Sequence, residues 1–230
     1  MRRLYPLFAM AIGACASAGA PQFADSNNDR GGDAQSDAPQ RRLDGGTDAS
    51  QATGDARPID SGGGGTCPDA VTGALATWSF TGASGSQVST DASATATGMV
   101  AGAISRSPAL TAVAGSGSIN ASGWPAGSTH DSTHYFTLSV TPPSGCAMDL
   151  TSVSIDTKAS GSGPTGTQLA TSADSFASAT TFTVSTTATA NLSVSGATSA
   201  VELRVYGYGA GSNAGTLRVT GDLVVTGTLR

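Results

Sequence analysis

The sequence is poor in the residue types that most functional sites require. Of its 230 residues, only 12% are charged and 5% are aromatic, with a single lysine, Lys158, and a single glutamate, Glu202. The net charge is −5 and no basic cluster is present, so we expect no nucleic-acid partner, because neutralising phosphates requires such a cluster. We also find no G-x-S-x-G nucleophile elbow or other catalytic motif. The sequence therefore predicts neither catalytic residues nor a cofactor.

A long hydrophobic run is missing as well. The most apolar stretch, residues 4–12, follows Arg2 and Arg3. It is far shorter than the ~18 residues that a membrane-spanning helix needs. A charged start and a short apolar stretch, followed by small residues, form the layout of a secretory signal peptide.

Residues Ile12-Gly13-Ala14-Cys15 resemble the lipobox of bacterial lipoproteins. This resemblance implies cleavage after residue 14, a signal peptide over residues 1–14 and lipid attachment to Cys15. The lipid anchor makes a membrane the expected partner. Ala16 follows Cys15, where inner-membrane retention commonly uses aspartate. We therefore expect a lipid-anchored protein of the cell envelope, at the outer membrane if the bacterium has two membranes.

The chain has three cysteines, an odd number for a secreted protein. If Cys15 carries lipid, Cys67 and Cys146 remain as a pair. In an oxidising compartment such a pair predicts a disulfide. The alternative is two buried free thiols that behave as small hydrophobic groups.

Residues 15–65 differ in composition from the rest of the chain. Residues 16–65 contain eight aspartates and four arginines, very few large apolar side chains, and four glycines at their end. Such a segment cannot bury enough apolar surface to offset its ordering entropy. We expect a disordered tether between the lipid and a folded domain. The aspartates lack the D-x-D-x-D-G spacing of a calcium loop, so a calcium array is the weaker alternative.

Residues 66–230 show apolar side chains at every second position, the pattern of strands with one buried and one wet face. Glycine, serine, proline and asparagine occupy the connections, and no window shows helical periodicity. The fold class predicted is all-β, a two-sheet antiparallel β-sandwich of about nine or ten strands. The alternating stretches are residues 76–80, 136–140, 153–155, 182–184, 192–194, 201–205 and 217–229.

This domain resembles the jelly-roll-like β-sandwich modules of secreted and surface-anchored bacterial proteins, including those with PEP-CTERM sorting tails. The chain ends at Thr228-Leu229-Arg230 without the apolar tail of the sorted relatives, so anchoring is expected at Cys15. The resemblance implies the fold and does not specify a ligand. It is carried by residues 76–80, 122–127 with 135–138, 161–165 with 172–176, and 203–209 with 215–219.

Three aromatic residues, Trp124, Tyr206 and Tyr208, are the candidates for a ligand site. Tyr206 and Tyr208 alternate with Val205, so both rings should project from the face opposite the buried stripe. Amphipathic rings in that position can stack on sugars. The alternative is that a loop covers this face and the rings pack beneath it. Trp78 alternates with apolar neighbours and is expected in the core.

The few ionisable side chains offer only weak alternatives. His130, Asp131 and His134 are close in sequence, but their spacing suits a polar loop better than a metal site. Glu202 should form a surface ion pair with Arg204. We expect no metal site. The alternative left open is a structural calcium that involves Asp222 in the last hairpin, which rests on analogy to the fold alone.

The predicted function is that of a lipid-anchored binding or adhesion module, with carbohydrate as the expected ligand class. The alternative is a structural envelope component without a small ligand, and a secreted hydrolase is a weaker third hypothesis.

Overall fold

The computed structural model describes Cys67 and residues 70–230. The predictions for the signal peptide, for Cys15 and for the tether over residues 15–65 lie outside the described residues. Thirteen strands and one short 3₁₀ helix make up the described part, and three of the strands have only two residues. Their bounds are β1 (Val71–Ser79), β2 (Ser89–Thr90), β3 (Ala94–Thr95), β4 (Val100–Arg106), β5 (Thr111–Ala112), β6 (Ser118–Ser122), β7 (Tyr135–Thr141), β8 (Met148–Ala159), β9 (Gly166–Thr171), η1 (Ser172–Asp174), β10 (Ala179–Phe182), β11 (Ala188–Ala197), β12 (Val201–Tyr208) and β13 (Leu217–Leu229).

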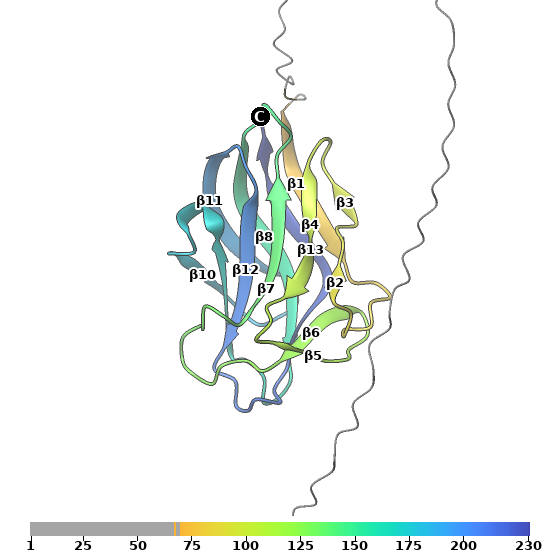
Figure 1. Cartoon of the computed structure of the whole chain (residues 1–230), viewed down its shortest axis with the longest axis vertical. Helices are drawn as coiled ribbons and strands as arrows, with labels where there is room; N and C mark the ends of the chain where they lie inside the picture. Colours follow the sequence, from red (N-terminus) through yellow and green to blue (C-terminus); the bar gives the residue numbers. More distant parts are fainter. Residues whose placement is uncertain (1–66, 68–69) are drawn as a thin grey trace, which may run out of the picture. The chain divides into compact units, whose positions relative to one another are not determined.

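The strands form two sheets that pack face to face (Figure 1). The seven-stranded sheet has the order β11-β8-β13-β1-β3, with β6 paired to β13 and β5 to β6. The six-stranded sheet has the order β10-β9-β12-β7-β4-β2. Every pairing between these strands is antiparallel. The predicted two-sheet antiparallel β-sandwich is therefore confirmed.

The two-residue alternation places the core between the sheets. In β7, Phe136, Leu138 and Val140 are buried, whereas Thr137 and Ser139 are only half-buried on the outer face. Successive side chains of a strand point to opposite faces, which is why this pattern divides the strand into an inner and an outer side. The largest fully buried side chains include Trp78, Phe80, Phe136, Leu75, Ile104, Ile119, Met148, Leu150, Ile155, Leu169 and Leu203.

Trp78 is a core residue, as the sequence predicts. Its side chain is fully buried, and its indole N–H donates to the carbonyl oxygen of Gly102 at 3.1 Å. Trp78 belongs to β1 and Gly102 to β4, so this hydrogen bond joins the two sheets. A buried tryptophan needs such an acceptor because an unpaired indole N–H is costly in the interior.

Cys67 and Cys146 form a disulfide, which confirms the predicted pair. Cys146 lies in the turn between β7 and β8. The next residue, Ala147, exchanges backbone hydrogen bonds with Arg230 at the end of the chain. The start of the domain, this turn and the C-terminus therefore meet at one end of the sandwich. Within the described part of the chain, no helix is long and apolar enough to span a membrane.

Candidate functional site

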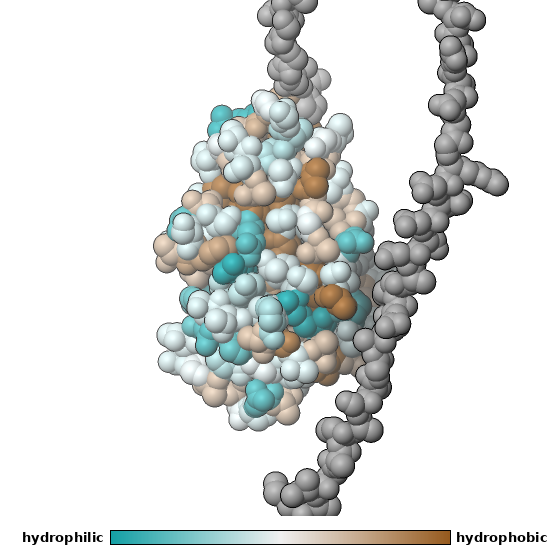
Figure 2. All heavy atoms as spheres, viewed as in Figure 1, coloured by the Kyte–Doolittle hydropathy of each residue, from teal (hydrophilic) through white to brown (hydrophobic). Residues whose placement is uncertain are grey.

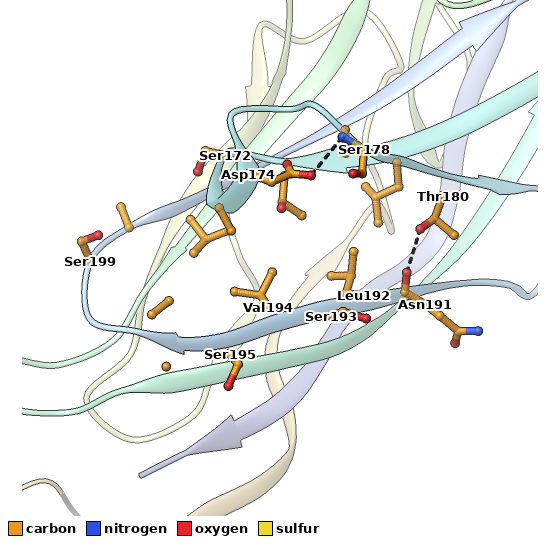
Figure 3. Close-up of a pocket in the computed structure, with 18 of the residues that line it drawn as sticks. Ser172, Asp174, Ser178, Thr180, Asn191, Leu192, Ser193, Val194, Ser195 and Ser199 are labelled. Atoms are coloured by element: carbon orange, nitrogen blue, oxygen red, sulfur yellow. Dashed lines mark hydrogen bonds between the residues drawn. The ribbon is translucent and has the colours of Figure 1, made fainter.

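A groove with a volume of about 860 Å³ opens along one edge of the sandwich (Figure 3). It lies between β10, the last strand of the six-stranded sheet, and β11, the last strand of the seven-stranded sheet. The Thr180 hydroxyl donates to the Asn191 carbonyl oxygen at 3.0 Å and links the two edges. No strand pairing joins β10 to β11, so the groove lies between the edges of the two sheets.

The floor and the rim of the groove differ in chemistry. Leu192 and Val194 point from β11 into the groove, whereas Ser193 and Ser195 point to the other side of that strand (Figure 3). The rim on the opposite side comes from the segment after β9 and is polar. Its carboxylate, Asp174, accepts a hydrogen bond from the Ser178 backbone N–H at 2.9 Å. The result is an aliphatic floor with a hydroxyl-rich rim.

A second hollow, which we call the depression, has a volume of about 470 Å³ and lies on the outer face of the six-stranded sheet. Thr137, Ser139 and Glu202 line it. Ser172 and Ala200 line both this depression and the edge groove, so the two hollows adjoin. Ser172 is held in place because its hydroxyl oxygen accepts from the Glu202 backbone N–H at 2.9 Å.

The turn that follows η1 connects two parts of the groove lining, Ser172–Asp174 and Ser178. Ser175 and Phe176 have φ angles of 60° and 61°, a left-handed conformation that is unusual for residues other than glycine. Two backbone hydrogen bonds hold the turn, from the Phe176 N–H to the Thr171 carbonyl and from the Ser175 N–H to the Ser172 carbonyl. Strain of this kind persists where the surrounding structure over-determines it. Asp174, the last residue of η1, stays at the groove, and the turn carries Phe176 onto Arg204 at the outer face of the six-stranded sheet.

Phe176 packs on an arginine that several groups hold in position. The guanidinium carbon of Arg204 lies 3.9 Å from the centre of the Phe176 ring and 4.2 Å from the centre of the Tyr135 ring. Its Nε donates to Glu202 at 2.7 Å, which confirms the predicted ion pair. The same carboxylate oxygen accepts from the Thr137 hydroxyl at 2.9 Å. A cation that is stacked on two rings and paired with a carboxylate is held in position, and much of its charge is compensated.

The ionisation of this cluster follows from its contacts. Burial by itself would lower the pKa of Arg204, but its hydrogen bonds to Glu202 and Tyr206 and the charge of Glu202 raise it overall. Burial raises the pKa of the neighbouring Tyr206 hydroxyl. Arg204 is therefore a permanent cation and Tyr206 a neutral phenol over the ordinary pH range.

Tyr206 does not form the exposed platform that its position in the sequence suggested. Only 1% of the residue is exposed, because a loop covers this part of the outer face. The His130 ring lies 4.5 Å from the Tyr206 ring, and Tyr135 meets it edge-on at 5.8 Å. His130 Nδ1 is in turn hydrogen-bonded to the side chain of Gln168 at 2.5 Å. The alternative of a ring packed beneath a loop is therefore the correct one for Tyr206.

Trp124 is also buried, and the expectation of an accessible ring is corrected here as well. It is 2% exposed, meets Phe136 edge-on at 5.3 Å and donates its indole N–H to the Ala121 carbonyl at 2.9 Å. Tyr208 is half-buried, and its ring lies over the backbone of Gly166. None of the three predicted aromatic residues lines the groove or the depression.

The two histidines have separate partners. His130 contacts Tyr206 and Gln168, whereas His134 lies beside Thr133 and Asp131. Hydrogen bonds from the Thr133 side chain and backbone lower the pKa of Asp131 to about 2. Among residues 67 and 70–230, no group of three or more histidine, cysteine, aspartate or glutamate side chains is arranged to hold a metal ion.

Sequence reasoning missed the residues that line the two hollows. Ser172, Asp174 and Ala200 belong to small-residue segments that resemble ordinary turns. The one distinctive feature in the sequence is Phe176, an aromatic residue within a serine- and alanine-rich stretch. It indicates a segment that packs on something, but it does not reveal that the partner is Arg204.

Comparisons with known proteins provide no further assignment. No protein-family model matches this chain, and no curated protein or solved structure is similar to it beyond chance.

Proposed function

We propose that this protein is a binding module of the bacterial cell envelope that holds a carbohydrate in the edge groove and the adjoining depression. One observation carries the proposal: the groove combines an aliphatic floor, Leu192 and Val194, with a rim of serine and threonine hydroxyls. Sugar rings present apolar C–H faces and many hydroxyls, so they match both surfaces at once. Ligand sites in general combine an apolar lining with a few well-placed polar groups.

The exterior of the domain supports the same proposal. The face seen in Figure 2 is mostly pale, with small separate patches of strongly polar or apolar residues. Val88 and Val100 are the exposed large apolar residues of the described part. No broad apolar patch of the kind that marks a protein–protein interface is visible on that face.

A glycan array probed with the full-length protein tests this proposal. Leu192→Ala removes part of the groove floor and should weaken binding to any glycan hit about tenfold, since each buried methylene contributes roughly 0.8 kcal/mol. Val88→Ala is the matched control, because it removes apolar atoms from a side chain that is 86% exposed and directly precedes β2, at the edge of the six-stranded sheet opposite β10. An array without hits, or equal effects of the two variants, would refute the proposal.

The proposed place of action is the outer membrane, through lipid on Cys15. Stable anchoring needs more than one acyl chain, which lipoprotein processing supplies. Cys15→Ser should release the protein into the soluble fraction or leave an uncleaved precursor. A variant that is processed and fractionates like the wild type would contradict lipidation without bearing on the groove.

The second candidate function is a structural envelope component without a small ligand. The observation that favours it is the burial of Trp124 and Tyr206, which removes the two rings best suited to stacking on sugar. The glycan array separates the two candidates, because the structural component should bind no glycan.

A further inference from the structure

The groove and the depression are two hollows with one shared border. Ser172 and Ala200 line both of them. Ala200 is exposed and has no side chain beyond its β-carbon, and Ser172 is kept low by its hydrogen bond to the Glu202 N–H. No large side chain therefore separates the hollow at the sandwich edge from the hollow on the outer face. A ligand that fills both must be an extended chain that crosses these two residues.

The charged side chains that line the route from the groove to the depression are acidic. Among the described residues, Asp174 and Glu202 are the charged side chains that line the two hollows. Glu202 is paired with Arg204, whereas Asp174 has no arginine or lysine partner within residues 70–230. A chain that crosses the border meets one uncompensated carboxylate.

The cations beside the path are already engaged. Arg204 is stacked on Phe176 and Tyr135 and bonded to Glu202. Arg230 is bound through two of its nitrogens by Asp149, at 2.9 and 3.1 Å. Both guanidiniums already have a carboxylate partner, so an anionic chain would compete with Glu202 and Asp149 for them while it also faces Asp174.

We infer that the ligand of this site is an extended glycan chain, neutral or cationic, that spans the groove and the depression by passing over Ser172 and Ala200. This inference rests on the proposed function and specifies its ligand class. Occupying two connected subsites with one chain raises affinity beyond that of either subsite, because the second contact becomes intramolecular. Affinity should therefore rise with chain length, and negative charge should lower it.

The test uses calorimetric titration of the full-length protein with defined oligosaccharides. The probes are N-acetylglucosamine oligomers from the disaccharide to the hexasaccharide, the cationic glucosamine oligomers and the anionic galacturonate oligomers. We expect the neutral hexasaccharide to bind at least about tenfold more tightly than the disaccharide. The cationic hexasaccharide should bind about two- to fivefold more tightly than the neutral one, as for an exposed ion pair, and the anionic one more weakly than both.

Two variants with matched controls locate these effects. Ala200→Leu places bulk on the shared border and should reduce hexasaccharide affinity to near that of the disaccharide, leaving the disaccharide within about twofold. Ala126→Leu, at an exposed position outside both hollows, is its control. Asp174→Asn keeps an oxygen for the Ser178 N–H and should abolish the preference for the cationic chain, whereas Asp91→Asn, at another exposed aspartate, should not.

The outcomes separate this inference from the proposed function. If the oligomers bind with equal affinity at every length, or if Ala200→Leu weakens all lengths alike, the extended-chain inference is overturned while carbohydrate binding stands. If the anionic oligomers bind most tightly, the inference about charge is overturned. If no glycan of any length or charge binds, here or on the array, the proposed function fails together with this inference.

Discussion

The disulfide between Cys67 and Cys146 joins residues whose Cα atoms lie 5.0 Å apart although 79 positions separate them in the sequence. It ties the first described residue of the domain to the turn between β7 and β8. The same end of the sandwich holds Arg230, through its backbone pairing with Ala147. Any pull on the chain before Cys67 is therefore transmitted to the β7–β8 turn as well as to β1.

Replacing both Cys67 and Cys146 by serine should lower the free energy of unfolding by about 2–5 kcal/mol, because closing a long loop restricts the unfolded chain. Urea denaturation followed by tryptophan fluorescence measures the change. The wild type under reducing conditions should approach the stability of the double variant, and the double variant should not respond to reductant. Equal stability of the oxidised wild type and the double variant would contradict the prediction.

The burial of Tyr206 gives a second prediction, which distinguishes it from Tyr208. Tyr206→Ala should lower the free energy of unfolding by about 3–5 kcal/mol, as is typical when a buried aromatic ring is removed. Tyr208→Ala removes a half-buried ring and should cost less than half as much. Chemical denaturation of both variants, measured in parallel, makes the comparison. Equal and small effects would mean that Tyr206 is not covered by the loop that carries His130.

Gly207 allows a test of how Trp124 packs. A β-carbon on Gly207 would lie 2.9 Å from side-chain atoms of Leu217 and Pro164 and 3.0 Å from the Trp124 ring. Gly207→Ala should therefore destabilise the domain by about 1–3 kcal/mol through overpacking. Gly161→Ala is the control, because nothing lies within 4 Å of the added atom, and it should leave the melting temperature nearly unchanged.

Asp149 provides a prediction on pH. Its hydrogen bond from Arg230, together with one from the Gly196 N–H, lowers its pKa from 3.8 to about 2. A carboxylate with a depressed folded-state pKa contributes stability above its unfolded pKa, and this contribution is lost as the pH falls from about 4 through 2. Arg230→Gln should raise the pKa of Asp149 toward 3.8, as measured by NMR titration of the side-chain carboxyl.

Asp131 is the internal control of that titration. Its pKa is lowered to about 2 by hydrogen bonds from Thr133, not by Arg230. Arg230→Gln should leave the Asp131 titration unchanged. If the two carboxyls shift together, or if Asp149 does not shift, Arg230 is not the cause of the low Asp149 pKa.

Several strands could not be found from the sequence, for a definite physical reason. β9 contains one large apolar residue, Leu169, and β6 contains one, Ile119. A period of two cannot be recognised from a single apolar side chain. These strands exist because neighbouring strands supply their hydrogen bonds: β9 pairs with β12 and β10, and β6 pairs with β13 and β5.

The candidate site was even less accessible to sequence reasoning. The prediction that Tyr206 projects from the face opposite the buried stripe of β12 is correct. The ring is nevertheless buried, because the loop that carries His130 covers that face. His130 lies 76 positions away from Tyr206 in the numbering and still stacks on it, a contact that local alternation cannot indicate. The groove likewise forms where β10 and β11 end two different sheets.

The sequence by itself determined the all-β class, the two faces of the longer strands, the Cys67–Cys146 pair and the ion pair between Glu202 and Arg204. These features follow from alternation, from composition and from proximity along one strand, all of which are local or countable. The tertiary structure alone decided that Trp124 and Tyr206 are buried, that Phe176 packs on Arg204 and that two hollows meet at Ser172 and Ala200. Those features depend on which strands become sheet edges and which loops cover a face, and these choices are made by long-range packing.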